Sequence, residues 1–116
     1  MRGPLISIVI ATRNREEFLT DLLKSLSHQS FKNFEVIIVD DNDGSRSGKG
    51  VKRIIQKYSY ELRIKLLCNL CNIGLPISLN RGVSIAKGKI VAYTDDDCVG
   101  DKDWCCTFQN GIRIIE

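Results

Sequence analysis

KIVAYTDDD, residues 89–97, is an apolar segment that ends in three consecutive aspartates. The apolar part predicts a strand over Ile90–Thr94, and a strand exit delivers the side chains that follow it to a fixed place. Three carboxylates gathered there repel one another, so a positive group is needed to neutralise them. A divalent metal with oxygen ligands is the simplest candidate. The stretch therefore predicts an acidic, metal-binding strand end.

A second acidic pair, Asp40 and Asp41, also comes at the end of an apolar strand, FEVIIVD at residues 34–40. In an open parallel sheet the carboxyl ends of the strands share one edge, and ligands bind at that edge. We expect both acidic segments to meet there. Two acidic strand ends on one edge indicate a site for a nucleotide and a metal.

Strand-like and helix-like segments alternate over the rest of the chain. LISIVIA, residues 5–11, is the continuous β-branched run of a buried parallel strand, and leucines at helical spacing follow it. The short connections predict right-handed crossovers and an α/β fold, with a mainly parallel sheet covered on both faces. The expected strands are Leu5–Ala11, Phe34–Asp40, Leu62–Leu66 (half-exposed or at an edge) and Ile90–Thr94. The expected helices are Glu16–His28 (Asn14 and Glu17 forming a capping box), one marked by Val51–Tyr58 after a loop at 42–50, Leu75–Lys87 with Gly88 just past its end, and a last one capped by Asp103.

The bulk composition is that of one soluble globular domain with a real core. The chain has 116 residues, 43% of them hydrophobic and 27% charged. Its net charge of +3 is slight and its basic residues are spread along the chain, so nucleic acid is not an expected partner. No apolar run reaches membrane-spanning length, and Met1–Pro4 is too short for a signal peptide.

Five cysteines include the C-x-x-C of Cys68 and Cys71 and the adjacent pair Cys105 and Cys106. A four-cysteine zinc site usually has two C-x-x-C pairs, and a redox C-x-x-C normally opens a helix after the first strand. We therefore interpret these cysteines as small buried hydrophobic residues in a reducing cytosol.

The fourth expected strand would lie at an open sheet edge if nothing follows it, and the chain stops at Glu116 within a helical pattern. An open edge invites pairing with another chain. We expect residues 1–116 to be a single, partial domain. Either the rest of a larger domain completes it, or a second copy pairs with the exposed edge to form a homodimer.

Four ordered motifs together resemble the nucleotide-binding half of a family 2 glycosyltransferase of the GT-A fold. They are ISIVIATRNR (6–15), FEVIIVDDNDGS (34–45), NIGLPISLNRG (72–82) and KGKIVAYTDDD (87–97), and they span almost the whole chain. The resemblance implies a Rossmann-like, three-layer α/β/α architecture of the nucleotide-diphospho-sugar transferase type. It also implies transfer of a sugar from a nucleoside diphosphate donor, most often with inversion.

The resemblance assigns nucleotide contacts to several positions. The loop after the first strand would line the nucleotide, with Arg13 meeting a phosphate, although Asn14 could be only a helix cap. Asp41 matches the carboxylate that accepts a hydrogen bond from the base, such as the ring N–H of uracil. Asp40 is expected to brace the turn, and the alternative for the pair is a solvated Asx-turn before Gly44. The implied nucleotide-binding residues are Ala11, Thr12, Arg13, Asn14, Asp41, Asn80, Asp95 and Asp96.

Asp95–Asp97 match the D-x-D element of the family. Asp97 would be the metal ligand, and Asp95 and Asp96 would contact the ribose, or the metal through water. Mg²⁺ and Mn²⁺ both suit such oxygen donors, and the metal offsets the charge that builds on the departing nucleoside diphosphate. A merely solvated acidic turn is the alternative.

The stretch with Asn72, Gly74 and Asn80 would pack beside the nucleotide, and here the chain departs from the family pattern. The position usually held by arginine is Leu79, with Arg81 two residues later. Because a helix rotates by about 200° over two residues, Arg81 cannot simply replace the missing cation.

These inferences favour a cytoplasmic domain that binds a UDP-sugar through a divalent metal and serves transfer to a saccharide, lipid or other acceptor hydroxyl. The general base is expected beyond Glu116, so we expect the chain alone to bind donor and to transfer sugar poorly. A non-catalytic nucleotide-binding or assembly module of the same fold is the alternative. A receiver-type signalling domain fits poorly, because ATRNR rather than an acidic pair follows the first strand.

Overall fold

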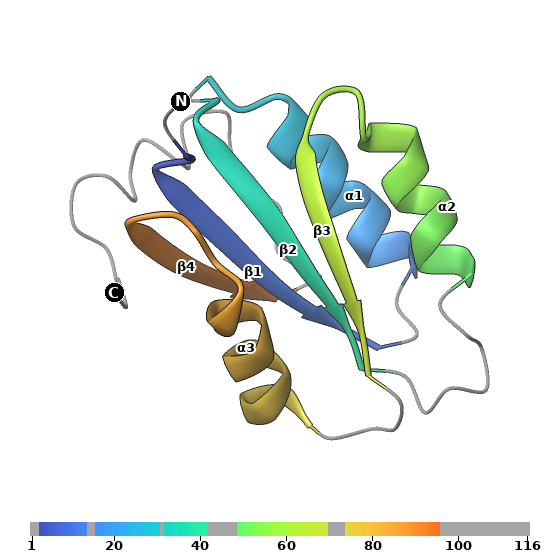
Figure 1. The fold of residues 1–116 in the computed structure, drawn as a ribbon. Helices are drawn as coiled ribbons and strands as arrows, with labels where there is room; N and C mark the ends of the chain where they lie inside the picture. The colour runs from blue at the N-terminus through green and yellow to red at the C-terminus, as the bar shows by residue number, and fades with distance from the viewer. Residues whose placement is uncertain (1–2, 14–15, 31, 42–48, 70–73, 96–116) are drawn as a thin grey trace.

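The computed structural model describes residues 3–13, 16–30, 32–41, 49–69 and 74–95. These form a parallel sheet of four strands in the order β3-β2-β1-β4, crossed by three helices (Figure 1). The strands are β1 (Ile6–Thr12), β2 (Phe34–Asp40), β3 (Arg63–Cys68) and β4 (Ile90–Asp95), and the helices are α1 (Glu16–Ser27), α2 (Lys49–Tyr58) and α3 (Leu75–Ser84). The expected α/β fold with a parallel sheet is confirmed.

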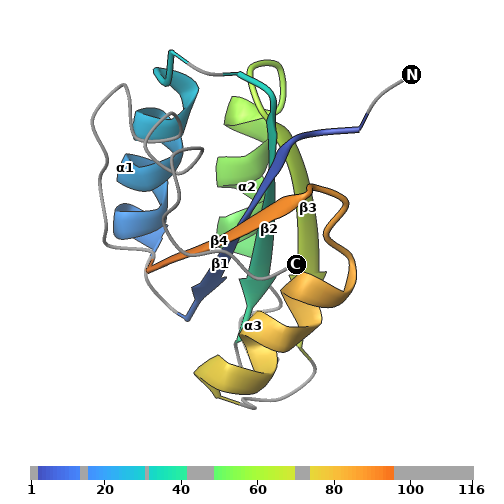
Figure 2. The same ribbon diagram turned by 90° about the vertical axis from the view of Figure 1, so that its left-hand side faces the viewer.

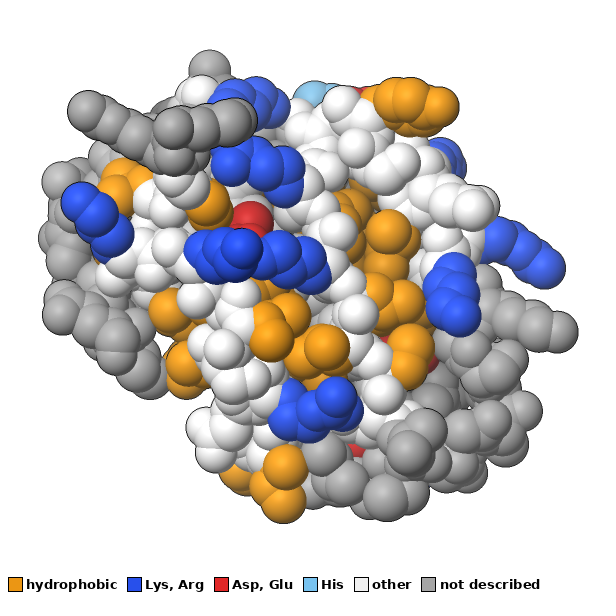
Figure 3. Space-filling view, viewed as in Figure 1, with side chains coloured by type: hydrophobic (Ala, Val, Ile, Leu, Met, Phe, Trp, Pro, Cys, Tyr) orange, Lys and Arg blue, Asp and Glu red, His pale blue; other side chains and the backbone are white. Residues whose placement is uncertain are grey.

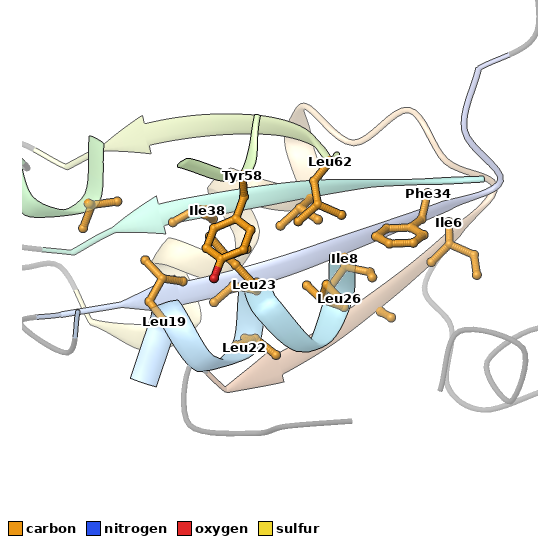
Figure 4. Close-up of a cluster of buried hydrophobic side chains, with 14 residues drawn as sticks. Ile6, Ile8, Leu19, Leu22, Leu23, Leu26, Phe34, Ile38, Tyr58 and Leu62 are labelled. Atoms are coloured by element: carbon orange, nitrogen blue, oxygen red, sulfur yellow. The ribbon is translucent and has the colours of Figure 1, made fainter. Parts of the chain in front are cut away.

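The larger core lies between the sheet and the pair α1 and α2. Every second residue of β1 and β2 points to this face, and the leucines of α1 pack on them at helical spacing (Figure 4). The buried members include Ile8, Leu22, Leu23, Ile38 and Tyr58. This apolar layer fixes the register of β1 against β2, because a slip of one residue would turn the apolar side chains to the opposite face.

A smaller core lies on the opposite face, under α3. Val9, Ile37, Val39 and Val91 are buried there, and Leu79 and other apolar side chains of the α3 segment pack on them. Figure 2 shows α1 and α2 on one side of the sheet and α3 on the other. The described chain therefore has the expected three layers.

The α3 face is only partly covered. Figure 3, drawn in the view of Figure 1, shows basic side chains over this face around a small acidic spot, with hydrophobic side chains among them. The edge strand β3 is half-exposed along most of its length, as its alternating sequence predicts.

Three expected boundaries are corrected. Helix α3 ends at Ser84 rather than Lys87, where the Ile85 N–H donates to the Gly82 carbonyl at 3.3 Å and the Ala86 N–H donates to the Val83 carbonyl at 3.0 Å. Gly88 is therefore not its cap; the Gly88 N–H donates to Ser7 Oγ at 2.8 Å. Helix α2 begins at Lys49, inside the expected loop 42–50.

Other boundaries shift by one or two residues: β1 runs from Ile6 to Thr12, β3 runs from Arg63 to Cys68, and β4 ends at Asp95. The expected last helix, the capping Asn14 and the glycine- and serine-containing loop at 42–48 lie outside the described residues. Within the described part of the chain, no helix is both long enough and apolar enough to cross a bilayer.

Candidate functional site

The two acidic segments flank the end of β1, as the parallel topology predicts. Asp95 on β4 is the Cα partner of Ala11, and Asp40 on β2 is the Cα partner of Thr12. The Asp41 N–H donates to the Thr12 carbonyl at 2.8 Å, which extends the β1–β2 pairing by one step. The carboxyl end of β1 is therefore the centre of the candidate site.

The carboxylate of Asp41 is buried, with 6% of the residue exposed, and each of its oxygens accepts a hydrogen bond. Asn69 Nδ2 donates to Oδ1 at 2.9 Å, and the backbone N–H of Gly74 donates to Oδ2 at 2.9 Å. Gly74 has φ 90°, a left-handed conformation that favours glycine, and it is the N-cap of α3. Asp41 therefore ties the end of β2 to the residue after β3 and to the start of α3, so it is not in a solvated turn.

Asn69 lies at the centre of a polar network behind Asp41. Its amide nitrogen also donates to Ser78 Oγ at 2.9 Å, and its oxygen accepts a hydrogen bond from Arg81 Nη1. The Asn69 N–H donates to the Asp40 carbonyl at 2.9 Å, which holds the residue in line with β2. Asn69 and Ser78 are 5% and 0% exposed, so these two members of the network are shielded from water.

Three successive residues of α3 lie in different environments. Leu79 packs on the apolar cluster around Val39, Asn80 is exposed, and Arg81 is half-buried against Asn69. Arg81 thus points away from Leu79, as helical rotation predicts, and its described contact is an amide oxygen.

The remaining expected site residues fall into two groups. Ala11 is half-buried, Thr12 is buried and Arg13 is exposed at the end of β1. The backbone of Asp95 ends β4 at the same edge, but its side chain lies outside the described set. Asn14, Asn72, Asp96 and Asp97 lie outside the described residues altogether.

Among the described side chains, no group of three or more histidine, cysteine, aspartate or glutamate residues could hold a metal ion. Cys68 is exposed with a free thiol, which corrects the expectation that it would be a buried hydrophobic residue. The other cysteines lie outside the described residues.

A second buried carboxylate, Glu35, lies at the opposite end of β2 and is 3% exposed. It accepts hydrogen bonds from Ser7 Oγ at 2.6 Å and from the Lys87 N–H at 2.8 Å, and it pairs with Lys65 Nζ at 3.0 Å. Burial alone would raise the pKa of Glu35, but these hydrogen bonds and the Lys65 charge outweigh burial and lower the pKa below its usual 4.5.

Sequence reasoning missed Asn69, Ser78 and Glu35. Asn69 follows the third strand, and its place at the carboxyl edge was the only signal that could have drawn attention to it. Glu35 is the polar residue in an otherwise apolar strand, FEVIIVD, and a buried charge needs partners.

The sequence of the chain matches a known family. The family model described as glycosyl transferase family 2 matches residues 7–113. The chain belongs to this glycosyltransferase family. Its four strands, with Asp41 and Asp95 at the edge, are therefore part of a glycosyltransferase GT-A fold.

Individual glycosyltransferases agree with this assignment. An uncharacterized glycosyltransferase of Methanocaldococcus jannaschii is 38% identical over 99 residues, which cover 84% of this chain and 33% of the relative. The crystal structure of S. aureus TarS 1-349 in complex with UDP-GlcNAc has a TM-score of 0.78 and 30% identity, covering 90% of this chain and 30% of TarS.

The mannosyltransferase PcManGT from Pyrobaculum calidifontis, in complex with GDP-Man and Mn²⁺, has a TM-score of 0.70 and 26% identity. The match covers 84% of this chain and 28% of PcManGT. The family 2 chain thus spans about a third of the length of the relatives that it matches.

Proposed function

We propose that this chain is the donor-binding part of a glycosyltransferase, a single partial GT-A domain that holds a nucleoside diphosphate sugar. The observation that carries the proposal is the buried Asp41 carboxylate, held by Asn69 and Gly74 beside the end of β1. The family match supports a sugar-nucleotide donor, and the similar structures with UDP-GlcNAc and GDP-Man support the same ligand class.

We assign Asp41 to the base of the nucleotide. A carboxylate offers about four acceptor positions on its two oxygens, so it can accept a hydrogen bond from a ligand as well as from the protein. The N–H of a uracil ring would be such a donor, and UDP is the diphosphate that we favour. We assign Ala11, Thr12 and Arg13, at and just past the end of the neighbouring strand, to the ribose and phosphates, together with Asn14 and Asn80.

We assign the metal to the aspartates at the end of β4. Asp95 ends this strand on the same edge as Asp41, and Asp96 and Asp97 follow it in the sequence. Their carboxylate oxygens fit Mn²⁺ or Mg²⁺, which would neutralise the diphosphate as it departs. PcManGT with Mn²⁺ supports this choice of ion.

Transfer requires more than the described residues supply. Inversion at the sugar needs a general base that takes the proton of the acceptor hydroxyl. We place this base, and most of the acceptor site, in the two thirds of the relatives' length that the chain does not span. The acceptor is a saccharide, a lipid or another hydroxyl compound, and transfer by residues 1–116 alone should be poor.

Calorimetric titration with UDP, with and without Mn²⁺, tests the proposal. We expect metal-dependent binding, and Asp97→Ala should remove the dependence on Mn²⁺. Asp41→Asn should weaken UDP binding by about 10- to 100-fold, the range for a lost charge-assisted hydrogen bond. Asp21→Asn changes an exposed aspartate on α1 and is the matched control.

Circular dichroism of each variant would show whether a loss of binding reflects a loss of fold. If the folded wild-type chain binds none of UDP, GDP and dTDP, the nucleotide site is absent. The two edge strands of the described sheet, β3 and β4, would then favour an assembly module of the same fold.

A further inference from the structure

We propose that Arg81 and Asn69 are positioning residues that set the direction in which Asp41 presents its carboxylate to the base. The proposal rests on the donor site described above and adds a determinant of base choice that does not touch the nucleotide. Its basis is the chain of contacts from Arg81 through the Asn69 amide to Asp41.

Chemistry fixes the orientation of the Asn69 amide at both ends. A guanidinium group has only donors, so the atom of Asn69 that faces Arg81 must be Oδ1. An ionised carboxylate has only acceptors, so the atom that faces Asp41 must be Nδ2. Ser78 can donate or accept and therefore imposes no orientation. Arg81 and Asp41 each enforce the amide orientation that the other needs.

The amide also separates the two charges. A direct arginine–carboxylate pair is often bidentate and uses both carboxylate oxygens. Here Arg81 donates to the amide oxygen of Asn69 instead. The guanidinium charge polarises the amide, and this strengthens the hydrogen bond from Asn69 Nδ2 to Asp41. The arrangement supplies a compensating cation for a buried carboxylate without a bidentate pair that would use both of its oxygens.

Burial makes the network sensitive to the loss of Arg81. Asn69 is 5% exposed, so without the guanidinium its Oδ1 would be a buried acceptor that has lost its charged donor. The side chain would then gain by rotating toward another donor, and this rotation would withdraw Nδ2 from Asp41. We expect the Asp41 carboxylate to lose its fixed direction.

The dissociation constants of UDP and CDP would show whether the Asp41 carboxylate is directed toward the base. The uracil ring carries an N–H where the cytosine ring of CDP carries an acceptor nitrogen, so a well-aimed carboxylate prefers UDP. We expect Arg81→Met to lower the CDP-to-UDP ratio of dissociation constants by about 3- to 10-fold, the range of one hydrogen bond. Arg81→Lys retains a cationic donor and should recover much of the ratio.

Arg53→Met is the matched control, because Arg53 is exposed on α2, across the sheet from α3. Equal weakening of UDP and CDP by Arg81→Met would show that Arg81 acts on the phosphates, and an unchanged ratio would show no role in base choice. Either result overturns the inference and leaves the donor site intact. A wild-type chain that binds neither nucleotide overturns the proposed function itself.

A second measurement needs no nucleotide. In a double-mutant cycle of Arg81→Met and Asp41→Asn, the free energies of unfolding in urea should be non-additive, because the two residues share Asn69. Additive losses would mean that Arg81 and Asp41 are independent, and they would overturn the inference even if the selectivity changes.

Discussion

At the residue scale, two buried carboxylates connect the α3 segment to β2 through hydrogen bonds. Asp41, just past the end of β2, holds Gly74 before the helix, and Glu35, near the start of β2, holds Lys87 after the helix. Each accepts one backbone N–H together with side-chain donors. Hydrogen bonds to a carboxylate are stronger than neutral ones, so these residues locate both ends of the α3 segment against the sheet.

Glu35 should make the stability of the chain depend on pH. Because the folded pKa is below the unfolded value near 4.5, the stabilisation is fully present above the unfolded pKa. It is lost as the pH falls through the lower, folded pKa. We expect the free energy of unfolding in urea to fall with acidification in this range, and Glu35→Gln to flatten that part of the curve.

At neutral pH, Glu35→Gln should cost about 1–3 kcal/mol, because the partners of a buried, charged acceptor are left poorly satisfied. Glu61→Gln, which changes an exposed glutamate, is the matched control and should follow the wild-type curve. A Glu35→Gln profile parallel to the wild type would show that Glu35 does not titrate with folding.

At the scale of elements, the close approach of α3 to the sheet depends on Gly82. A Cβ atom added at this position would lie 2.4 Å from Val9 Cγ1 and 3.3 Å from Val39 Cγ2. Both valines are buried in the cluster under α3, so neither can move away freely.

Gly82→Ala should therefore destabilise the chain by about 1–3 kcal/mol through overpacking, despite the higher helix propensity of alanine. Thermal unfolding would measure this. Gly3→Ala is the control, because nothing lies within 4 Å of the added methyl group. An equal or higher melting temperature for Gly82→Ala would contradict the close packing of α3.

The hydrophobic patterns of the sequence predicted which segments form strands and helices. They predicted less well where those strands and helices end. The apolar runs of β1 and β2 and the leucine spacing of α1 were sufficient, because burial imposes those periods. Helix α3 ends at Ser84, earlier than expected, and beyond it the Lys87 N–H donates to Glu35 instead of continuing the helix. This tertiary contact has no signal in the sequence around Lys87.

The site was predictable only as far as topology determines it. The meeting of Asp40 and Asp95 beside β1 follows from parallel strands. The contact of Arg81 with Asn69 depends on the rotation of α3 about its axis, which the packing of Leu79 sets. In the sequence, Arg81 lies two residues after the position that usually holds arginine in the family. In the structure it donates a hydrogen bond to Asn69.

At the scale of the whole molecule, the two edges of the described sheet differ. Strand β3 exposes Arg63 and carries the half-exposed Lys65, so two copies of this edge would repel each other. Strand β4 carries Ile90–Tyr93, an uncharged run, at the opposite edge of the described sheet.

We therefore expect residues 1–116 to associate through β4 as the protein concentration rises. Light scattering over a concentration series should show a mass that approaches the dimer. Raising the salt concentration should change this little if an uncharged edge is responsible. A monomer at the highest concentration would count against edge pairing.

The position of β1 between β2 and β4 also has a consequence for the order in which the chain folds. Ile6 pairs with Phe34 on one side and with Ile90 on the other, so the second pairing closes a loop about three times as long as the first. The extra entropy of closing that loop is about 1 kcal/mol. During synthesis, β1, β2 and β3 leave the ribosome before β4 does, so the pairing of β1 with β2 beside Asp41 can form before Asp95 arrives. We expect the nucleotide-binding edge to be completed in the last step of folding, and ligand to protect the chain only after β4 has docked.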